Sequence, residues 1–179
     1  MFTETVLNEL YKIGKVVTIK SKTELIAVGD KVDKTFVVLR GAFISLYYDP
    51  VEETFHTDNF HLSTFNNVMT VIDSYILGSP SNREIRAVSN SEVLVLKKGD
   101  LEKLIAKNAE VRDVANENTM NTLIFENNIK AKRLSYSPAD FYKHLITNYS
   151  QITKNVPSKY IADFMGVSPQ YLSKIKRKM

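Results

Sequence analysis

Residues 158–179 read Ser158-Lys-Tyr-Ile-Ala-Asp-Phe-Met-Gly-Val-Ser-Pro-Gln-Tyr-Leu-Ser-Lys-Ile-Lys-Arg-Lys-Met179. Gly166 stands directly after one helical pattern, where a left-handed residue ends a helix without the steric penalty of a side chain. Ser168 and Pro169 then suit the N-cap and the first position of a second helix. The two predicted helices share one apolar set, namely Ile161, Met165, Leu172 and Ile175. The stretch therefore predicts two short helices that cross at a tight corner.

The spacing of this corner matches a DNA-binding helix–turn–helix. Gly166 lies four residues after the small Ala162, Leu172 follows six residues later, and Ile175 follows three residues after that. In this motif the second helix enters the major groove. The outward side chains of the second helix include no acid: Gln170, Tyr171, Ser173, Lys174, Lys176, Arg177 and Lys178. A helical hairpin with a glycine corner and no role in DNA binding is the alternative.

Charge is divided unevenly along the chain. Residues 1–129 hold 14 Lys/Arg against 18 Asp/Glu, a net charge of −4, whereas residues 130–179 hold 10 Lys/Arg against two acids, a net charge of +8. A basic terminal segment is typical of a protein that binds a polyanion. A solvated basic surface is the simpler explanation, and the local pattern favours the polyanion.

Composition excludes several classes of protein. The chain contains no cysteine, so it has no disulfide, no thiol nucleophile and no cysteine-ligated iron–sulfur cluster. No apolar run approaches the roughly 18 residues of a membrane span, and the N-terminus lacks a signal sequence. We therefore expect a cytoplasmic protein with no membrane partner.

The middle of the sequence predicts short strands, and the rest predicts helices. β-branched and aromatic residues recur at 35–41, 42–48, 54–60, 84–88 and 92–97, with Gly41 at a turn or bulge between the first two. Several short strands at this spacing favour an antiparallel barrel or jelly roll. Helices are expected at the first 11 residues, at 66–77, after an Asp100 N-cap, at 110–133 and at 139–148.

The long helix at 110–133 carries a thin apolar stripe, consisting of Val111, Val114, Asn118, Thr122, Phe125 and Ile129. Because this stripe is partly polar, it cannot form a strong coiled coil alone, although it could form a dimer seam assisted by other contacts. Packing against its own sheet is the alternative.

Taken together, these features resemble the catabolite activator/fumarate-nitrate regulator (Crp/Fnr) superfamily of bacterial transcription factors. The resemblance covers nearly the whole chain and is closest to the small members found in the Bacteroidetes. It is carried by Phe36-Val-Val-Leu-Arg-Gly41, Pro80-Ser81, Ile85-Arg-Ala87, Ser91-Glu-Val-Leu-Val-Leu96 and the segment 160–175.

This resemblance implies an α+β protein in three parts. Residues 1–109 would form a jelly-roll sensor similar to cyclic-nucleotide-binding domains, residues 110–133 a connecting and dimerising helix, and residues 134–179 an all-α helix–turn–helix domain. Its partners would be double-stranded DNA, a second copy of the chain and RNA polymerase. Only four residues of the sequence follow Ile175, so we expect no β-hairpin wing after the second helix.

The cyclic-nucleotide cassette of the superfamily is degenerate here. Thr70 and Val71 stand where a Gly-Glu pair would hold the ribose, and Ser81 and Asn82 stand where an Arg-Ser/Thr pair would hold the phosphate. A buried phosphate without a charged partner is costly to desolvate. Arg83 is near in sequence, but a neighbour on a strand points to the opposite face. We expect no cyclic nucleotide and no other cofactor.

The resemblance to the superfamily also implies roles in DNA binding for the residues at matching positions. Ser168 and the helix N-terminus would hold a phosphate, and Pro169 would touch a thymine methyl. Gln170 and Lys174 would face base edges. Lys159, Lys176 and Arg177, with Lys178 in the basic tail, would bind phosphates.

Two other classes of protein are alternatives to this interpretation. A cupin-like metal-binding jelly roll would need an H-x-H pair and a later histidine on a strand, whereas His56 and His61 are separated by four residues around Asp58, and His144 lies on a predicted helix. We therefore expect no metal site. A non-DNA interaction module is opposed by the intact spacing around Gly166. No G-x-S-x-G or Walker motif points to an enzyme.

The sequence does not identify a small molecule that the predicted sensor domain would bind. Aromatic residues that could line a pocket or fill the core of the barrel are Tyr47, Tyr48, Phe55, Phe65 and Tyr75.

Overall fold

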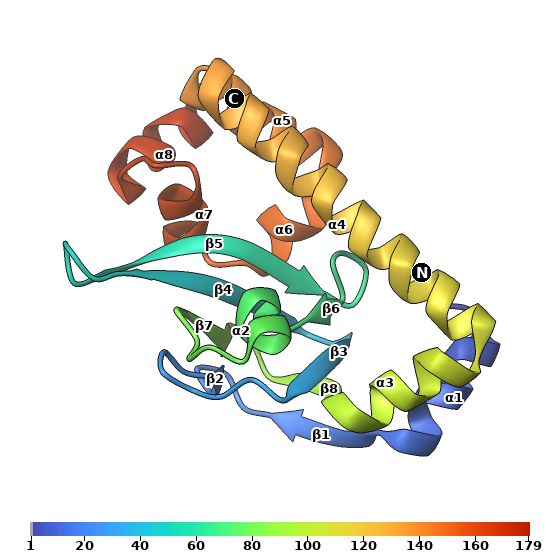
Figure 1. The fold of residues 1–179 in the computed structure, drawn as a ribbon. Helices are drawn as coiled ribbons and strands as arrows, with labels where there is room; N and C mark the ends of the chain where they lie inside the picture. Colours follow the sequence, from blue (N-terminus) through green and yellow to red (C-terminus); the bar gives the residue numbers. More distant parts are fainter. Residues whose placement is uncertain (1) are drawn as a thin grey trace.

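The computed structural model describes residues 2–179, so Met1, the first residue of the predicted sensor domain, lies outside the described residues. A strand-rich domain is followed by a long helix, α4 (Ala109–Ser135), and then by a cluster of short helices that we call the head (residues 136–179) (Figure 1). Among the described residues, no helix combines the length and the apolar character that crossing a membrane requires.

The strands form two four-stranded sheets in which every pairing is antiparallel. The first sheet has the order β1-β8-β3-β6 and the second has the order β2-β7-β4-β5. The strand bounds are β1 Lys15–Ile19, β2 Glu24–Ile26, β3 Lys34–Arg40, β4 Ala42–Asp49, β5 Thr54–Leu62, β6 Val68–Met69, β7 Arg83–Ala87 and β8 Ser91–Lys97. This confirms the predicted antiparallel β-rich domain.

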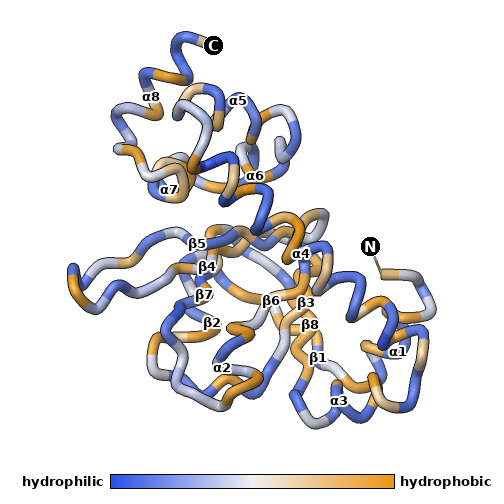
Figure 2. Tube along the Cα trace, turned by 45° about the horizontal axis from the view of Figure 1, so that its top comes forward, coloured by the Kyte–Doolittle hydropathy of each residue, from blue (hydrophilic) through white to orange (hydrophobic). Residues whose placement is uncertain are grey.

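The strands β3 and β4 are covered on both faces over most of their length, which explains why they read as nearly continuous apolar runs (Figure 2). Side chains alternate between the two faces of a strand. On β3, Phe36 and Val38 lie in the core between the sheets, whereas Val37 faces outward against α1 (Glu4–Ile13). On β4, Phe43 lies in the core between the sheets, whereas Ile44 faces outward toward the head.

Gly41 is the point at which the chain passes from one sheet to the other, because β3 and β4 belong to different sheets. Its φ of 92° lies in the left-handed region. An added Cβ would approach the Oγ of Ser91 to 2.1 Å and the Cα of Ser91 to 2.8 Å. Glycine is therefore required both by the backbone conformation and by the close approach of β8.

The prediction of a helix over residues 66–77 was wrong in its first half. Residues 68–69 form β6, and α2 spans only Ile72–Leu77. Asn66 adopts a left-handed φ of 46°, which is incompatible with a right-handed helix, and its side chain donates to the carbonyl oxygen of Phe60. The predicted Asp100 cap was also wrong, because α3 (Lys98–Lys107) begins two residues earlier with no side-chain cap.

The stripe predicted on the long helix as a dimer seam packs inside its own chain. Val111 lies against α1 and β8, and Phe125 and Ile129 lie against the outer face of the second sheet and the head. The alternative, packing against its own sheet, is therefore correct for this face. The opposite face of α4 carries exposed apolar side chains, with exposed fractions of 60 % for Met120, 59 % for Ile124 and 80 % for Leu134.

The head consists of α5 (Pro138–Asn148), α6 (Ser150–Asn155), α7 (Ser158–Phe164) and α8 (Pro169–Arg177). It sits on the second sheet, with α6 and α7 over β5 (Figure 1). One apolar cluster runs from Ile44 and Phe60 of that sheet through Phe125 of α4 to Leu145 and Leu172 of the head. The head and the sheet thus share a continuous core.

Replacing Gly41 by alanine should destabilise the protein more than replacing Gly29, which makes a matched control. Gly29 has a similar φ of 90°, yet nothing lies within 4 Å of its added Cβ. Gly29→Ala should cost about 1–2 kcal/mol for the left-handed backbone, and Gly41→Ala roughly 1–3 kcal/mol more for overpacking. Urea unfolding measures the loss in the free energy of unfolding for each variant. Equal losses would show that Ser91 moves away from the added Cβ without strain.

Candidate nucleic-acid interface

The corner between α7 and α8 is built by backbone geometry. Gly166 adopts a φ of 69°, and nothing lies within 4 Å of the Cβ that a side chain would add, so the dihedral angle alone calls for glycine. The N–H of Gly166 donates to the carbonyl oxygen of Asp163 at 2.8 Å, and the N–H of Val167 donates to that of Ala162 at 3.0 Å. These bonds satisfy carbonyl groups at the end of α7 and turn the chain toward α8.

The second helix begins at a side-chain cap. The Oγ of Ser168 accepts a hydrogen bond from the N–H of Tyr171 at 3.1 Å, and Pro169 occupies the first helical position. Leu172 and Ile175 are buried in the head, which fixes the face of α8 that points outward. The predicted cap, corner and apolar set are therefore all present.

Most of the predicted DNA-contacting residues lie on the exposed face. These are Lys159, Ser168, Pro169, Gln170, Lys174 and Arg177, and Lys178 of the basic tail is exposed as well. The ammonium of Lys159 lies 4.6 Å from the ring centroid of Tyr160. The exposed face of α8 has no acid, and Lys174, Arg177 and the adjacent Lys178 make it cationic.

Lys176 is the exception among these residues. Its side chain is half-buried, its ammonium donates to the Oγ of Ser158 at 2.5 Å, and it lies 5.6 Å from the ring centroid of Tyr142. Lys176 therefore ties α8 to α7 and α5 in this structure. A phosphate would have to draw it away from these partners.

Asp163 of α7 anchors the head to the sheet, and sequence reasoning missed this role. Its Oδ2 accepts a hydrogen bond from the backbone N–H of Thr57 on β5, and its Oδ1 lies 3.4 Å from the Nδ1 of His56. Phe164 packs edge-to-face on Phe60 of β5, with ring centroids 4.7 Å apart. The only available signal was that Asp163 is one of two acids in the basic segment.

The degenerate cassette positions are used by the fold itself. The hydroxyl of Thr70 donates to the carbonyl oxygen of Lys34, and Val71 is buried in the core between the sheets. Ser81 is buried, and its hydroxyl donates to the carbonyl oxygen of Arg83 at 2.7 Å. Asn82 accepts a hydrogen bond from the Arg83 guanidinium through its side-chain oxygen.

Arg83 does not point to the opposite face from its cassette neighbour Asn82, which corrects the expectation from the sequence. Its Nε donates to Asp58 of β5 at 2.8 Å, and its Nη1 donates to Asp73 of α2 at 3.2 Å. Arg83 opens β7 in the same alternation as Ile85, which faces the core between the sheets, so its side chain reaches α2. Two carboxylates therefore already neutralise this guanidinium.

The surroundings of Arg83 are acidic. Glu126 of α4 accepts a hydrogen bond from the side-chain amide of Asn59 at 3.0 Å. Burial, followed by the charge of Asp58, raises the pKa of Glu126. The single positive charge of Arg83 thus lies near the carboxyl groups of Asp58 on β5, Asp73 on α2 and Glu126 on α4.

His61 lies on β5 inside the strand-rich domain and is 6 % exposed. Its Nδ1 lies 3.0 Å from the carbonyl oxygen of Asn66, and because a carbonyl can only accept, this nitrogen carries the proton. Burial lowers the pKa of His61 to about 4. The imidazole is therefore neutral at pH 7 and has a structural role.

The histidines considered for a cupin-like site are apart in the structure. His61 is buried against Asn66, His56 faces Asp163, and His144 of α5 lies beside Asn148. The aromatic residues considered for a pocket do not share one either. Tyr48 pairs with Phe55, Phe65 with Phe125 and Tyr149, Tyr47 with Arg83, and Tyr75 with Lys98.

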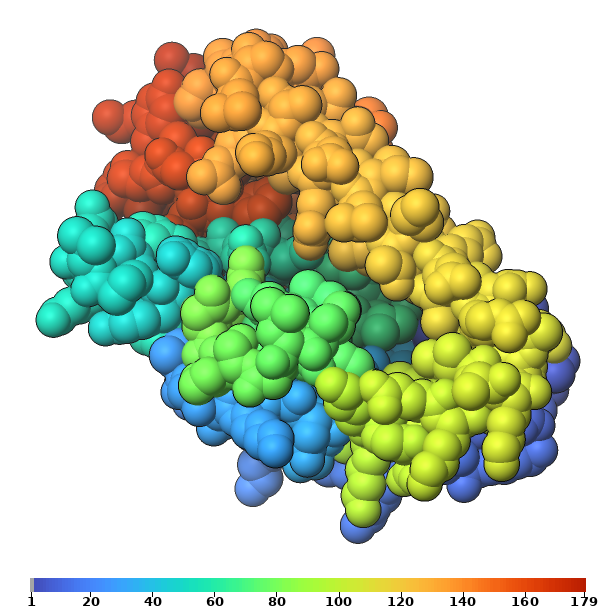
Figure 3. Space-filling model, in the orientation of Figure 1, coloured from blue at the N-terminus to red at the C-terminus, as the bar shows by residue number. Residues whose placement is uncertain are grey.

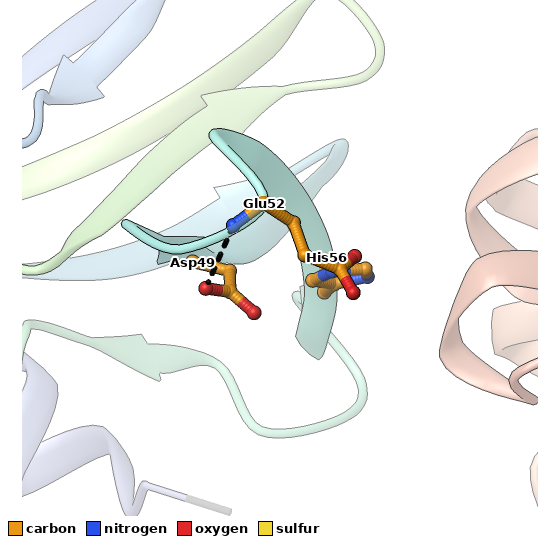
Figure 4. A group of neighbouring side chains, drawn as sticks. All are labelled: Asp49, Glu52 and His56. Atoms are coloured by element: carbon orange, nitrogen blue, oxygen red, sulfur yellow. Dashed lines mark hydrogen bonds between the residues drawn. The ribbon is translucent and has the colours of Figure 1, made fainter.

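A different group comes together at the tip of the β4–β5 hairpin. Asp49, Glu52 and His56 each place one potential metal-ligating atom within 4.8 Å of the other two (Figure 4). Sequence reasoning missed this group because the spacing of three and then four residues matches no cupin pattern.

Three solved structures illustrate what the chain is similar to. FixK2 from Bradyrhizobium japonicum superposes with a TM-score of 0.75 at 14 % identity, over 93 % of this chain and 84 % of its own. The c-di-GMP-responsive global regulator CLP of Xanthomonas campestris gives 0.74 at 10 % identity, over 98 % and 91 %. The catabolite activator protein of Thermus thermophilus gives 0.60 at 12 % identity, over 99 % and 83 %.

No protein-family model matches the chain, and no curated protein matches it in sequence. At these low identities the similarity to solved structures establishes the fold. The chain has the fold of the Crp/Fnr-type regulators, as its sequence resemblance predicts.

The buried His61 should make the protein less stable in acid. Because its pKa is about 4 in the folded state and 6.5 in the unfolded chain, the unfolded chain binds more protons between these values. The contribution of His61 to the free energy of unfolding is thus fully present above about pH 6.5. It falls by up to ~3 kcal/mol as the pH drops toward 4. In urea unfolding, His61→Asn should reduce this pH dependence, and His56→Asn should retain it. An unchanged pH dependence in His61→Asn would contradict this assignment.

Proposed function

We propose that the protein is a sequence-specific DNA-binding transcriptional regulator of the Crp/Fnr type, which acts as a homodimer. The observation that supports this most is the acid-free exposed face of α8, which the Gly166 corner directs outward and the Ser168 cap fixes in place. The fold shared with regulators of this type agrees with the proposal.

Each exposed side chain has a role that follows from its chemistry. Gln170 and Lys174 read base edges, since a glutamine amide pairs with adenine and a lysine donates to guanine. Ser168 and the N-terminus of α8 hold a phosphate, and Pro169 touches a thymine methyl. Lys159, Arg177 and Lys178 bind phosphates and fix the position of the helix in the groove.

The proposed dimer forms through the outer face of α4. The exposed apolar residues of this face lie three, four, 11 and 14 residues apart, spacings that place them on one side of the helix: Met120, Leu123, Ile124 and Leu134. The outer side of α4 runs uncovered along one edge of the molecule (Figure 3). A two-fold axis along this seam would present two α8 helices to half-sites about 34 Å apart on a pseudo-palindromic sequence.

The sensor domain in this proposal does not bind a cyclic nucleotide. Thr70, Val71, Ser81 and Asn82 offer no charge to a ribose or a phosphate, and Arg83 is held by Asp58 and Asp73. A cyclic phosphate would have to displace two carboxylates beside a third, Glu126, which is electrostatically unfavourable.

Substituting Lys174 and Lys178 distinguishes base reading from phosphate binding. Lys174→Ala should lower the preference for one base pair of the site by about 1–3 kcal/mol, because a direct base contact is lost. Lys178→Ala should weaken binding to all sequences equally. Fluorescence-anisotropy titrations with specific, single-mismatch and random duplexes measure both effects. A uniform loss in both variants would defeat the role assigned to Lys174.

A charge on the α4 seam should separate the dimer. Ile124→Glu should weaken self-association by at least about tenfold, because a dimer would bury an unpaired carboxylate. Thr119→Glu, an exposed substitution on the flank of the same helix, is the matched control and should retain the dimer. Sedimentation equilibrium gives the association constants. A dimer of equal strength in both variants would place the interface elsewhere.

A further inference from the structure

The β4–β5 hairpin gathers three side chains with metal-binding groups. Asp49 ends β4, Glu52 lies in the turn and His56 lies on β5, so all three come from one short segment that folds back on itself (Figure 4). Their ligating atoms lie within 4.8 Å of one another. Two carboxylates and one imidazole give this tip a local negative charge, which favours a cation.

The kind of donor selects the kind of cation. Calcium and magnesium bind almost exclusively oxygen ligands, and copper(I) prefers sulfur ligands. A set of one imidazole nitrogen and two carboxylate oxygens suits a divalent ion such as zinc, cobalt or nickel. Three protein ligands leave one or more coordination positions for water.

The hairpin already holds the first of these ligands in place. The Oδ1 of Asp49 accepts hydrogen bonds from the backbone N–H groups of Val51 at 2.8 Å and Glu52 at 3.3 Å. These bonds fix the carboxylate relative to the turn and leave its Oδ2 for a metal ion.

The histidine has a second partner outside the hairpin, and this partner is independent of the cluster. The Nδ1 of His56 faces the Oδ1 of Asp163 on α7 at 3.4 Å, and the Thr57 N–H holds the other oxygen of that carboxylate. A metal-ligating histidine almost always donates its second ring N–H to a carboxylate, which fixes the ring and its tautomer. Nε2, now 3.1 Å from the Oγ1 of Thr54, is then the nitrogen that can bind a metal ion.

We propose that Asp49, Glu52 and His56 bind one divalent transition-metal ion of the zinc type, with Asp163 as the residue that positions His56. This site does not depend on the proposed DNA-binding function. Since Asp163 belongs to the head and the three ligands belong to the sensor domain, a bound ion strengthens the contact between the two. The proposal departs from the sequence-based prediction that the protein has no metal site.

Cobalt(II) titration of the metal-free full chain tests the proposal, because the visible absorption of cobalt reports its ligands. We expect one cobalt ion per chain, displaced by zinc. Glu52→Gln should weaken the affinity at least about 100-fold, because loss of a ligand should cost at least as much as alteration of an outer partner, which costs about 10- to 100-fold. The neighbouring exposed acid Glu53 makes the matched control, and Glu53→Gln should bind as the unchanged protein does.

The positioning role of Asp163 has its own readout. Asp163→Asn should weaken cobalt binding about 10- to 100-fold and shift the absorption spectrum, because the outer partner of the ligating imidazole is altered. An unchanged affinity and spectrum would overturn this role. Absence of saturable cobalt binding, equal binding in Glu52→Gln and Glu53→Gln, or loss of binding in His144→Asn in place of His56→Asn would overturn the site itself. None of these results bears on DNA binding by α8.

Discussion

The outer face of the second sheet is apolar, and most of the structure follows from the need to cover it. Ile44, Leu46 and Phe60 lie on this outer face and point away from the core between the sheets. Among the described residues, no helix of the strand-rich domain belongs to the apolar cluster that they form. The head and the middle of α4 cover this face instead, with Phe164 of α7 packed against Phe60. Burial of apolar surface at about 25 cal/mol per Å² thus joins the second sheet, the middle of the long helix and the head into one core.

Packing of the head on the sheet also determines which side of α8 is exposed to solvent. The apolar sides of α7 and α8 face the shared core, so the cationic side of α8 faces solvent. The left-handed Gly166 makes this division possible, since it lets two short helices cross within four residues. Asp163 adds a polar attachment at the edge of the same contact, which places His56 and the hairpin tip beside the head.

Local features of the sequence predicted the head well. The Ser168 cap, the proline at the first helical position and the glycine corner depend on interactions within a few residues, and all three are present. The same holds for the antiparallel strands, whose residue types and turns are local signals. Features that depend on distant partners were missed or reversed. The inward stripe of α4 was ambiguous because the sequence does not show which face meets the sheet, and Arg83 was misplaced because its partners Asp58 and Asp73 are 25 and 10 residues away.

The direct test of the central claim, that α8 is a recognition helix carried by a two-fold dimer, is selection of bound sequences from a randomised duplex pool with the full chain. The account predicts enrichment of a pseudo-palindrome whose half-sites are separated by one helical turn, about 34 Å. Recovery of unenriched sequences, or of a single half-site without its symmetric partner, would contradict it.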